Sequence, residues 1–339
     1  MKKLLFILTL SLLVFGGFSF KQIYFTPLYF EIPKGFPKPV YDFKNNPLTE
    51  EGFQLGRNLF YDPILSRDNT ISCASCHLQQ TGFTHVDHDL SHGIEGRIGT
   101  RNSMTLMNLA WSKTFMWDGG VNHLDVQAIH PITSEVEMDE TLENVVSKLQ
   151  RSEKYQHLFQ DAFGTKKITG QLTLKAISQF VVMLTTSNSK YDKVLRKEEQ
   201  FTDMEQKGYA VFKRNCASCH QEPLFTNDGF ENNGLSIDTT LNDVGRMRIT
   251  QKETDRQKFK VPTLRNVQFT FPYMHDGRFE TLNEVIKHYN SGIEKSATLS
   301  PKLQQPMLLS DDERTELLAF LKTLTDKEFL FNPRFSFPR

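Results

Sequence analysis

Apolar side chains recur at helical spacing in several segments of this chain. Residues 49–52 read as a capped helix start that leads into Phe53, Leu55, Leu59 and Phe60. Thr202 and Asp203 open a second segment of this kind, and further helices are predicted at about residues 142–150, 172–183, 282–289 and 311–324. Ser310 is the expected N-cap of the last one, with acidic residues in its first turn. The pattern therefore predicts a mostly α protein.

Two of these predicted helices share a pattern. Residues 55–60 read Leu-Gly-x-x-Leu-Phe and residues 207–212 read Lys-Gly-x-x-Val-Phe, which suggests that one unit was duplicated. The 339 residues exceed the usual length of about 100–200 per domain. The polar, charged stretch 187–201 is the expected boundary between two domains.

The amino terminus predicts export. Lys2 and Lys3 precede an apolar run from Leu4 to about Phe20, the arrangement of a secretory signal, so residues 1–20 are interpreted as a signal peptide. No clear Ala-x-Ala cleavage site follows, which leaves an uncleaved membrane anchor as the alternative. Either interpretation predicts a periplasmic protein.

The charge of the chain gives little guidance to function. Forty acidic residues balance forty basic ones, which argues against a nucleic-acid partner held by charge. The 28 phenylalanines suit packing around a large flat cofactor, but they would equally suit any dense core.

The four cysteines provide the strongest chemical signal. Residues 73–77 and 216–220 both read Cys-Ala-Ser-Cys-His, the attachment signature of c-type haem. The two thiols reach the vinyl groups on one porphyrin edge, and the following imidazole ligates iron. The expected attachment and ligand residues of the two haems are Cys73, Cys76, His77, Cys216, Cys219 and His220.

Zinc and disulfide interpretations explain these cysteines less well. Paired Cys-x-x-Cys motifs of zinc ribbons usually lie about 15–20 residues apart and need no following histidine. Disulfides within such short loops are usually redox-active rather than structural. We therefore expect two cytochrome c-like haem domains, a first at residues 21–195 and a second at residues 196–339.

Further motifs, in order and spacing, resemble the bacterial dihaem cytochrome c peroxidases and the related MauG-type enzymes. The resemblance covers about residues 48–324. It rests on Gly-Thr-Arg-Asn at 99–102, Phe-Met-Trp-Asp-Gly at 115–119, Val-Glu-Met at 136–138, Pro-Thr-Leu-Arg-Asn at 262–266 and Tyr-Met-His-Asp-Gly at 273–277. It implies that the first domain is peroxidatic and that the second transfers electrons.

The resemblance also implies a distal pocket at the first haem. Glu137 falls on the family's acid–base glutamate, and Gln127 and Pro131 fall on its distal-pocket positions, with Gln127 able to hydrogen-bond peroxide. Composition alone favours a solvated surface carboxylate for Glu137, which has three acidic neighbours within three positions.

Two further roles follow from the same resemblance. Trp117 matches a tryptophan that lies between the haems and shortens the electron path, although an isolated tryptophan is more often a core residue. Asn102, Thr270 and Pro272 match an interhaem calcium site of hard oxygen ligands. An ordinary turn is the alternative for Thr270 and Pro272.

The chain departs from the peroxidase pattern at the first haem. Ile94 stands where many peroxidases carry a histidine that blocks the iron, and an alkyl side chain cannot ligate. His92 lies two positions away and is the alternative blocking residue, although a surface position is expected for it. The first haem should therefore be open in the resting protein.

The second departure concerns the distal ligand of the second haem. Tyr289 stands where the peroxidases supply methionine, and MauG-type enzymes carry tyrosine there. An anionic phenolate favours ferric iron and lowers the potential relative to a thioether. Met307 and Met274 are the competing ligands.

These features predict an exported dihaem peroxidase that reduces hydrogen peroxide with electrons from a small c-type cytochrome or a cupredoxin. A MauG-type oxidase that modifies side chains of a partner protein is the first alternative, and a plain dihaem electron carrier is the second. The resembled peroxidases are commonly dimers, so a homodimer is a further expectation.

Overall fold

The structure is a computed structural model, and it describes residues 25–338. The predicted signal or anchor at residues 1–20 lies outside this range. Among the helices of the described range, none is long and apolar enough to cross a membrane.

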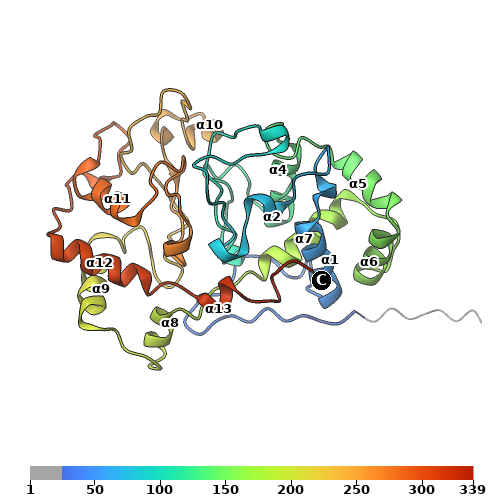
Figure 1. Cartoon of the computed structure of the whole chain (residues 1–339), viewed down its shortest axis with the longest axis horizontal. Helices are drawn as coiled ribbons and strands as arrows, with labels where there is room; N and C mark the ends of the chain where they lie inside the picture. The colour runs from blue at the N-terminus through green and yellow to red at the C-terminus, as the bar shows by residue number, and fades with distance from the viewer. Residues whose placement is uncertain (1–24, 339) are drawn as a thin grey trace, which may run out of the picture.

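Short helices joined by long turns make up most of the described chain (Figure 1). One two-stranded antiparallel sheet joins β1 (Phe230–Glu231) to β2 (Phe259–Lys260). The mostly α prediction is confirmed. The helices are α1 (Glu50–Tyr61), α2 (Cys73–Cys76), α3 (Leu124–Gln127), α4 (Ile129–Thr133), α5 (Leu142–Arg151), α6 (Glu153–Phe163), α7 (Gly170–Val182), α8 (Lys190–Leu195), α9 (Asp203–Asn215), α10 (Met247–Thr250), α11 (Leu282–Lys287), α12 (Asp311–Lys322) and α13 (Lys327–Leu330).

The predicted helix at 282–289 ends earlier than its apolar pattern suggested. Thr281 caps α11 through a reciprocal pair of hydrogen bonds with Glu284. After Lys287 the backbone widens into a π-helical turn over His288–Gly292. Such turns often mark functional sites, and this one carries Tyr289.

Each domain is built on one pair of packed helices. In the first domain α1 packs on α7, and in the second α9 packs on α12. Gly56 and Gly208 lie where these helices meet, because a Cβ on either glycine would overlap the backbone of the partner helix. The shared sequence pattern thus corresponds to a shared packing position.

The repeat extends into the loops. Residues 105–108 read Thr-Leu-Met-Asn and residues 263–266 read Thr-Leu-Arg-Asn. Both asparagines adopt left-handed backbone conformations, with φ of 58° at Asn108 and 55° at Asn266. Both begin a short 3₁₀ turn. The two domains are therefore structural repeats of each other in these loops.

Two equivalent hydrogen bonds join the domains at their shared face. The amide of Asn102 donates to the carbonyl of His275 at 2.7 Å, and the amide of Lys260 donates to the carbonyl of Trp117 at 2.7 Å. Trp117 and His275 occupy the same position in the two repeated Met-x-Asp-Gly segments. This exchange of backbone bonds holds Trp117 against the second domain.

The carboxyl-terminal tail returns to the first domain and ends beside α1 (Figure 1). Phe329, Leu330 and Phe335 are buried in the hydrophobic core of the first domain. The hydroxyl of Tyr61 on α1 donates to the carbonyl of Phe335 at 2.7 Å. The tail therefore packs on the first domain although it follows the second in sequence.

Candidate active site

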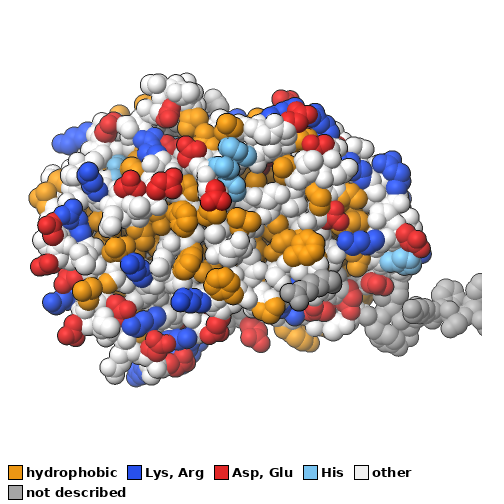
Figure 2. All heavy atoms as spheres, in the orientation of Figure 1, with side chains coloured by type: hydrophobic (Ala, Val, Ile, Leu, Met, Phe, Trp, Pro, Cys, Tyr) orange, Lys and Arg blue, Asp and Glu red, His pale blue; other side chains and the backbone are white. Residues whose placement is uncertain are grey.

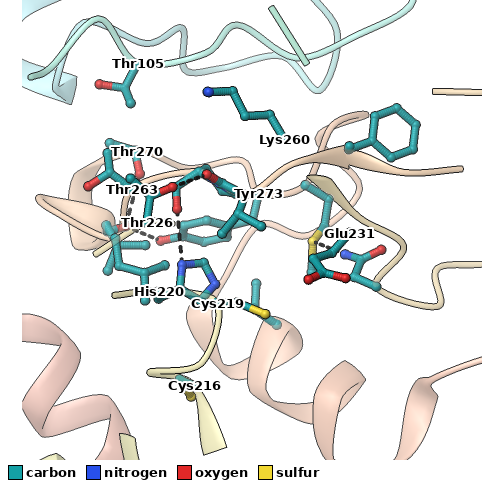
Figure 3. A pocket seen from close by; sticks show the side chains of 18 of the residues that line it. Thr105, Cys216, Cys219, His220, Thr226, Glu231, Lys260, Thr263, Thr270 and Tyr273 are labelled. Carbon is teal, nitrogen blue, oxygen red and sulfur yellow. Dashed lines mark hydrogen bonds between the residues drawn. The ribbon is translucent and has the colours of Figure 1, made fainter. Parts of the chain in front are cut away.

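The second Cys-x-x-Cys-His motif opens onto a cavity of about 280 Å³ between the domains. Figure 3 shows Cys216, Cys219 and His220 on one side of this cavity, with Thr105 and Lys260 on the opposite side. Most of the lining is apolar, and both domains contribute to it. A largely apolar space beside two thiols and an imidazole suits a covalently held porphyrin.

Both motif histidines are oriented as axial ligands require. The Nδ1 atom of His77 bonds the carbonyl of Phe83 at 2.8 Å. The Nδ1 atom of His220 bonds the carbonyls of Phe225 and Pro262, both at 3.1 Å. A carbonyl can only accept, so Nδ1 carries the proton and the lone pair resides on Nε2. Burial lowers the pKa of each imidazole to about 4, which keeps it neutral.

The zinc and disulfide alternatives find no support in this arrangement. All four cysteines are unpaired. Within residues 25–338 no three His, Cys, Asp or Glu side chains are grouped so that they could hold a metal ion. Each motif instead stands alone in its own domain, as separate haem sites require.

Glu137 lies beside the first motif. Burial, followed by the charge of the Glu137 carboxylate, raises the pKa of the Cys76 thiol to about 11. Burial also raises the pKa of Glu137 itself, while His130 and Ser134 oppose this change. The side chain of Glu137 retains 30% of its exposure, and its Oε1 atom lies 3.8 Å from Nδ1 of the half-exposed His130. The carboxyl of Glu137 is therefore partly buried close to Cys76, and its pKa is raised.

The segment that carries Ile94 packs directly on Glu137. The side chain of Ile94 is fully buried, and its amide donates to the carbonyl of Glu137 at 2.8 Å. The imidazole of His92 stacks on that of His88, with ring centroids 4.2 Å apart. His92 is thus engaged by another histidine while Ile94 occupies the interior.

Gln127 and Trp117 are linked through Met116. The Nε2 atom of Gln127 donates to the sulfur of Met116 at 3.7 Å. Trp117 lines the interdomain cavity, and its Nε1 donates to the carbonyl of Asn102 at 2.8 Å. Pro131 precedes Glu137 in the same bend, where its carbonyl accepts from the amide of Met138. These contacts join the candidate distal pocket to the tryptophan between the domains.

All three candidate ligands of the second haem line the same cavity. Tyr289, Met274 and Met307 each contribute to its wall. Burial raises the pKa of Tyr289 to about 12, and a hydrogen bond from Asn233 partly opposes this rise. No sequence motif singled out Asn233 or His130. Asn233 contacts Met274 and His130 lies near Glu137 only because the chain folds in this way.

The three residues matched to a calcium site also meet at this cavity. Asn102, Thr270 and Pro272 all line it. Asn102 is buried, and its Nδ2 donates to the carbonyl of Asp89 at 3.0 Å. Asn102 belongs to the first domain, and Thr270 and Pro272 belong to the second, so the wall of one cavity carries all three.

Two family descriptions match the chain, one for each domain. Residues 50–200 match di-haem cytochrome c peroxidase, and residues 205–325 match cytochrome c. The chain belongs to the di-haem cytochrome c peroxidase family. The recognised resemblance and the two cytochrome c-like domains are confirmed, and the domains carry c-type haems.

Relatives of both kinds within this family are similar to the chain. Methylamine utilization protein MauG of Methylorubrum extorquens is 36% identical over 87% of this chain and 83% of its own length. Cytochrome c551 peroxidase of Nitrosomonas europaea is 33% identical over 84% and 82%.

A solved structure supports the same placement. It is described as a MauG-like protein associated with microbial copper homeostasis, and it is 33% identical to this chain. The match has a TM-score of 0.85 and covers 92% of this chain and 99% of that one. Relatives named peroxidase and relatives named MauG are therefore similar to this chain at nearly the same sequence identity, 33% and 36%.

Proposed function

We propose that this protein reduces hydrogen peroxide to water, using electrons from a small c-type cytochrome or a cupredoxin. The observation that carries the proposal is the placement of Glu137 beside the first haem motif, with a raised pKa and with Ile94 buried next to it. An electron carrier needs neither an acid–base group nor an open distal side. Relatives named cytochrome c peroxidase support the same reaction.

The reaction joins one peroxide with two protons and two electrons to give two waters. The haem, when bound, supplies the redox chemistry that cleaves the oxygen–oxygen bond. Glu137 takes a proton from one peroxide oxygen and returns it to the departing oxygen. Gln127 orients the peroxide with its amide, and Met116 holds that amide in place.

Trp117 supports the second part of the proposal, in which oxidising equivalents are shared between the haem domains. It lies on the first domain, lines the cavity of the second motif and is fixed by hydrogen bonds at both Nε1 and its carbonyl. An indole held in this way provides a short path between the two sites.

We place the protein in the periplasm because Lys2 and Lys3 precede an apolar run at the amino terminus.

Acidic and basic side chains are interspersed over the face in Figure 2, so the face shown has no single dominant charge for the docking of an electron donor.

One observation favours a second candidate function. Tyr289 lies in the cavity of the second motif, at the position where MauG-type enzymes carry tyrosine. A phenolate ligand favours a low potential, which suits an enzyme that stores oxidising equivalents for use on a partner protein. MauG of Methylorubrum extorquens is also among the relatives.

The two enzymatic functions differ in the molecule that is oxidised, which is a small redox protein for the peroxidase and a side chain of a partner protein for the MauG-type enzyme. We expect peroxide to oxidise a reduced small cytochrome steadily in the presence of the haem-loaded protein. Glu137→Gln should slow this oxidation by about 10²–10⁴-fold. Glu135→Gln, which changes an exposed carboxylate two positions away, should leave it unchanged. If peroxide does not oxidise the cytochrome but a partner protein is covalently modified, the MauG-type function would be established instead.

A further inference from the structure

Asn233 connects two of the candidate ligands of the second haem. Its Nδ2 donates to the sulfur of Met274 at 3.4 Å. The main-chain carbonyl of Asn233 accepts a hydrogen bond from Nε2 of His288 at 3.0 Å. His288 directly precedes Tyr289 in the π-helical turn. The main chain of Asn233 therefore anchors the side chain of His288, the neighbour of Tyr289, while the side chain of Asn233 engages Met274.

Asn233 also shares the lining of the cavity of the second motif with Tyr289. Asn233, Tyr289 and Met274 all line the cavity that contains His220. Because a primary amide has two N–H donors, one side chain can serve the phenol oxygen and the thioether sulfur together.

The first domain contains a matching arrangement. Met116 and Met274 occupy the same position in the repeated segments, with φ of 70° and 76°. An amide donates to each sulfur, from Gln127 in the first domain and from Asn233 in the second. The two amides come from different places in the sequence, since Gln127 lies 11 residues after Met116 and Asn233 lies 41 residues before Met274. Each domain therefore holds the sulfur of its repeated methionine with an amide, although only the methionines are equivalent in the repeat.

We propose that Asn233 is a positioning residue that directs Tyr289, rather than Met274, to the iron of the second haem. This inference rests on the proposed tyrosine ligation. The amide donates to the anionic phenolate, which stabilises it as a ligand. The same group holds the thioether sulfur in a hydrogen bond and so keeps Met274 from competing. Asn233 thereby keeps the potential of the second haem low.

The test replaces Asn233 with leucine, which has a similar size and no donor. In Asn233→Leu, Met274 should replace Tyr289 on the iron. The ferric protein should then gain the weak long-wavelength band of a methionine–iron bond, and the midpoint potential of the second haem should rise. Met274→Leu alone should keep the wild-type spectrum and potential. The double variant Asn233→Leu/Met274→Leu should lack the new band.

Each result has a distinct meaning. An unchanged spectrum in Asn233→Leu, or a fall in potential without the band, would overturn the positioning role. Tyr289→Phe tests the ligation on which the inference rests, and an unchanged ferric spectrum there would refute tyrosine ligation itself. If Asn233→Leu fails to retain both haems, Asn233→Ser provides the same test, with a smaller rise in potential and a weaker band expected.

Discussion

The backbone amide of Ile94 donates a 2.8 Å hydrogen bond to the carbonyl oxygen of Glu137. Gly93, one residue earlier, approaches the same backbone so closely that a Cβ would overlap the carbonyl oxygens of Val136 and Glu137. The segment that would carry a blocking histidine in many relatives is therefore packed on Glu137, the proposed acid–base residue. The backbone of Glu137 and the buried Ile94 are therefore packed together.

This packing predicts a specific effect of Gly93→Ala. The added methyl group has no room, so it should displace the Glu137 backbone and slow peroxide cleavage by more than tenfold while both haems stay attached. Gly96→Ala is the matched control in the same loop, because no atom lies within 4 Å of its added Cβ. Its φ of +70° should cost about 1 kcal/mol of stability without slowing catalysis. Stopped-flow mixing with peroxide measures the rate of peroxide cleavage in each variant. Equal rates in Gly93→Ala and Gly96→Ala would contradict the account.

The raised pKa of Glu137 predicts the pH dependence of peroxide cleavage. Glu137 must be deprotonated to accept a proton, so the rate should fall as the pH drops through its pKa. Burial raises that pKa, and the acid limb should therefore lie above the usual value of about 4.3. His130→Asn should move the limb further up, because the nearby imidazole lowers the pKa of Glu137. An acid limb that persists in Glu137→Gln would assign it to another group.

The match of Asn102, Thr270 and Pro272 to the family's calcium site, together with their place in the lining of one cavity, predicts a calcium ion between the domains. Metal analysis of the purified protein should find calcium, and Asn102→Ala should remove it, since the ion loses its only side-chain ligand among the three matched residues. Asn45→Ala, at an exposed asparagine, should retain the metal. Equal calcium content in both variants would show that Asn102 is not a ligand.

The sequence predicted most of the helices and both haem motifs because these features are local. The Thr202 cap and the apolar residues of α9 lie within a few positions of each other, and so do the cysteines of each motif. The family motifs likewise brought Glu137 and Trp117 to attention. Fold class was therefore accessible from the sequence.

Contacts made only by the folded chain were not accessible in this way. Asn233 lies 41 residues from Met274 and 55 from His288, and its neighbours in sequence carry no recognisable motif. The return of Phe335 to the core of the first domain likewise depends on packing between distant segments. The π-helical turn at Tyr289 replaces the regular helix that periodicity predicted, because periodicity describes only regular structure.

The most direct test of the account is to mix the fully oxidised, haem-loaded protein with hydrogen peroxide and follow its absorption and electron paramagnetic resonance spectra. Because Ile94 cannot ligate iron and is held against Glu137, the first haem should be high-spin at rest and should react at once. Glu137→Gln should show the same resting spectrum and a slower reaction. A resting protein with two low-spin haems that ignores peroxide until one electron is added would contradict the account.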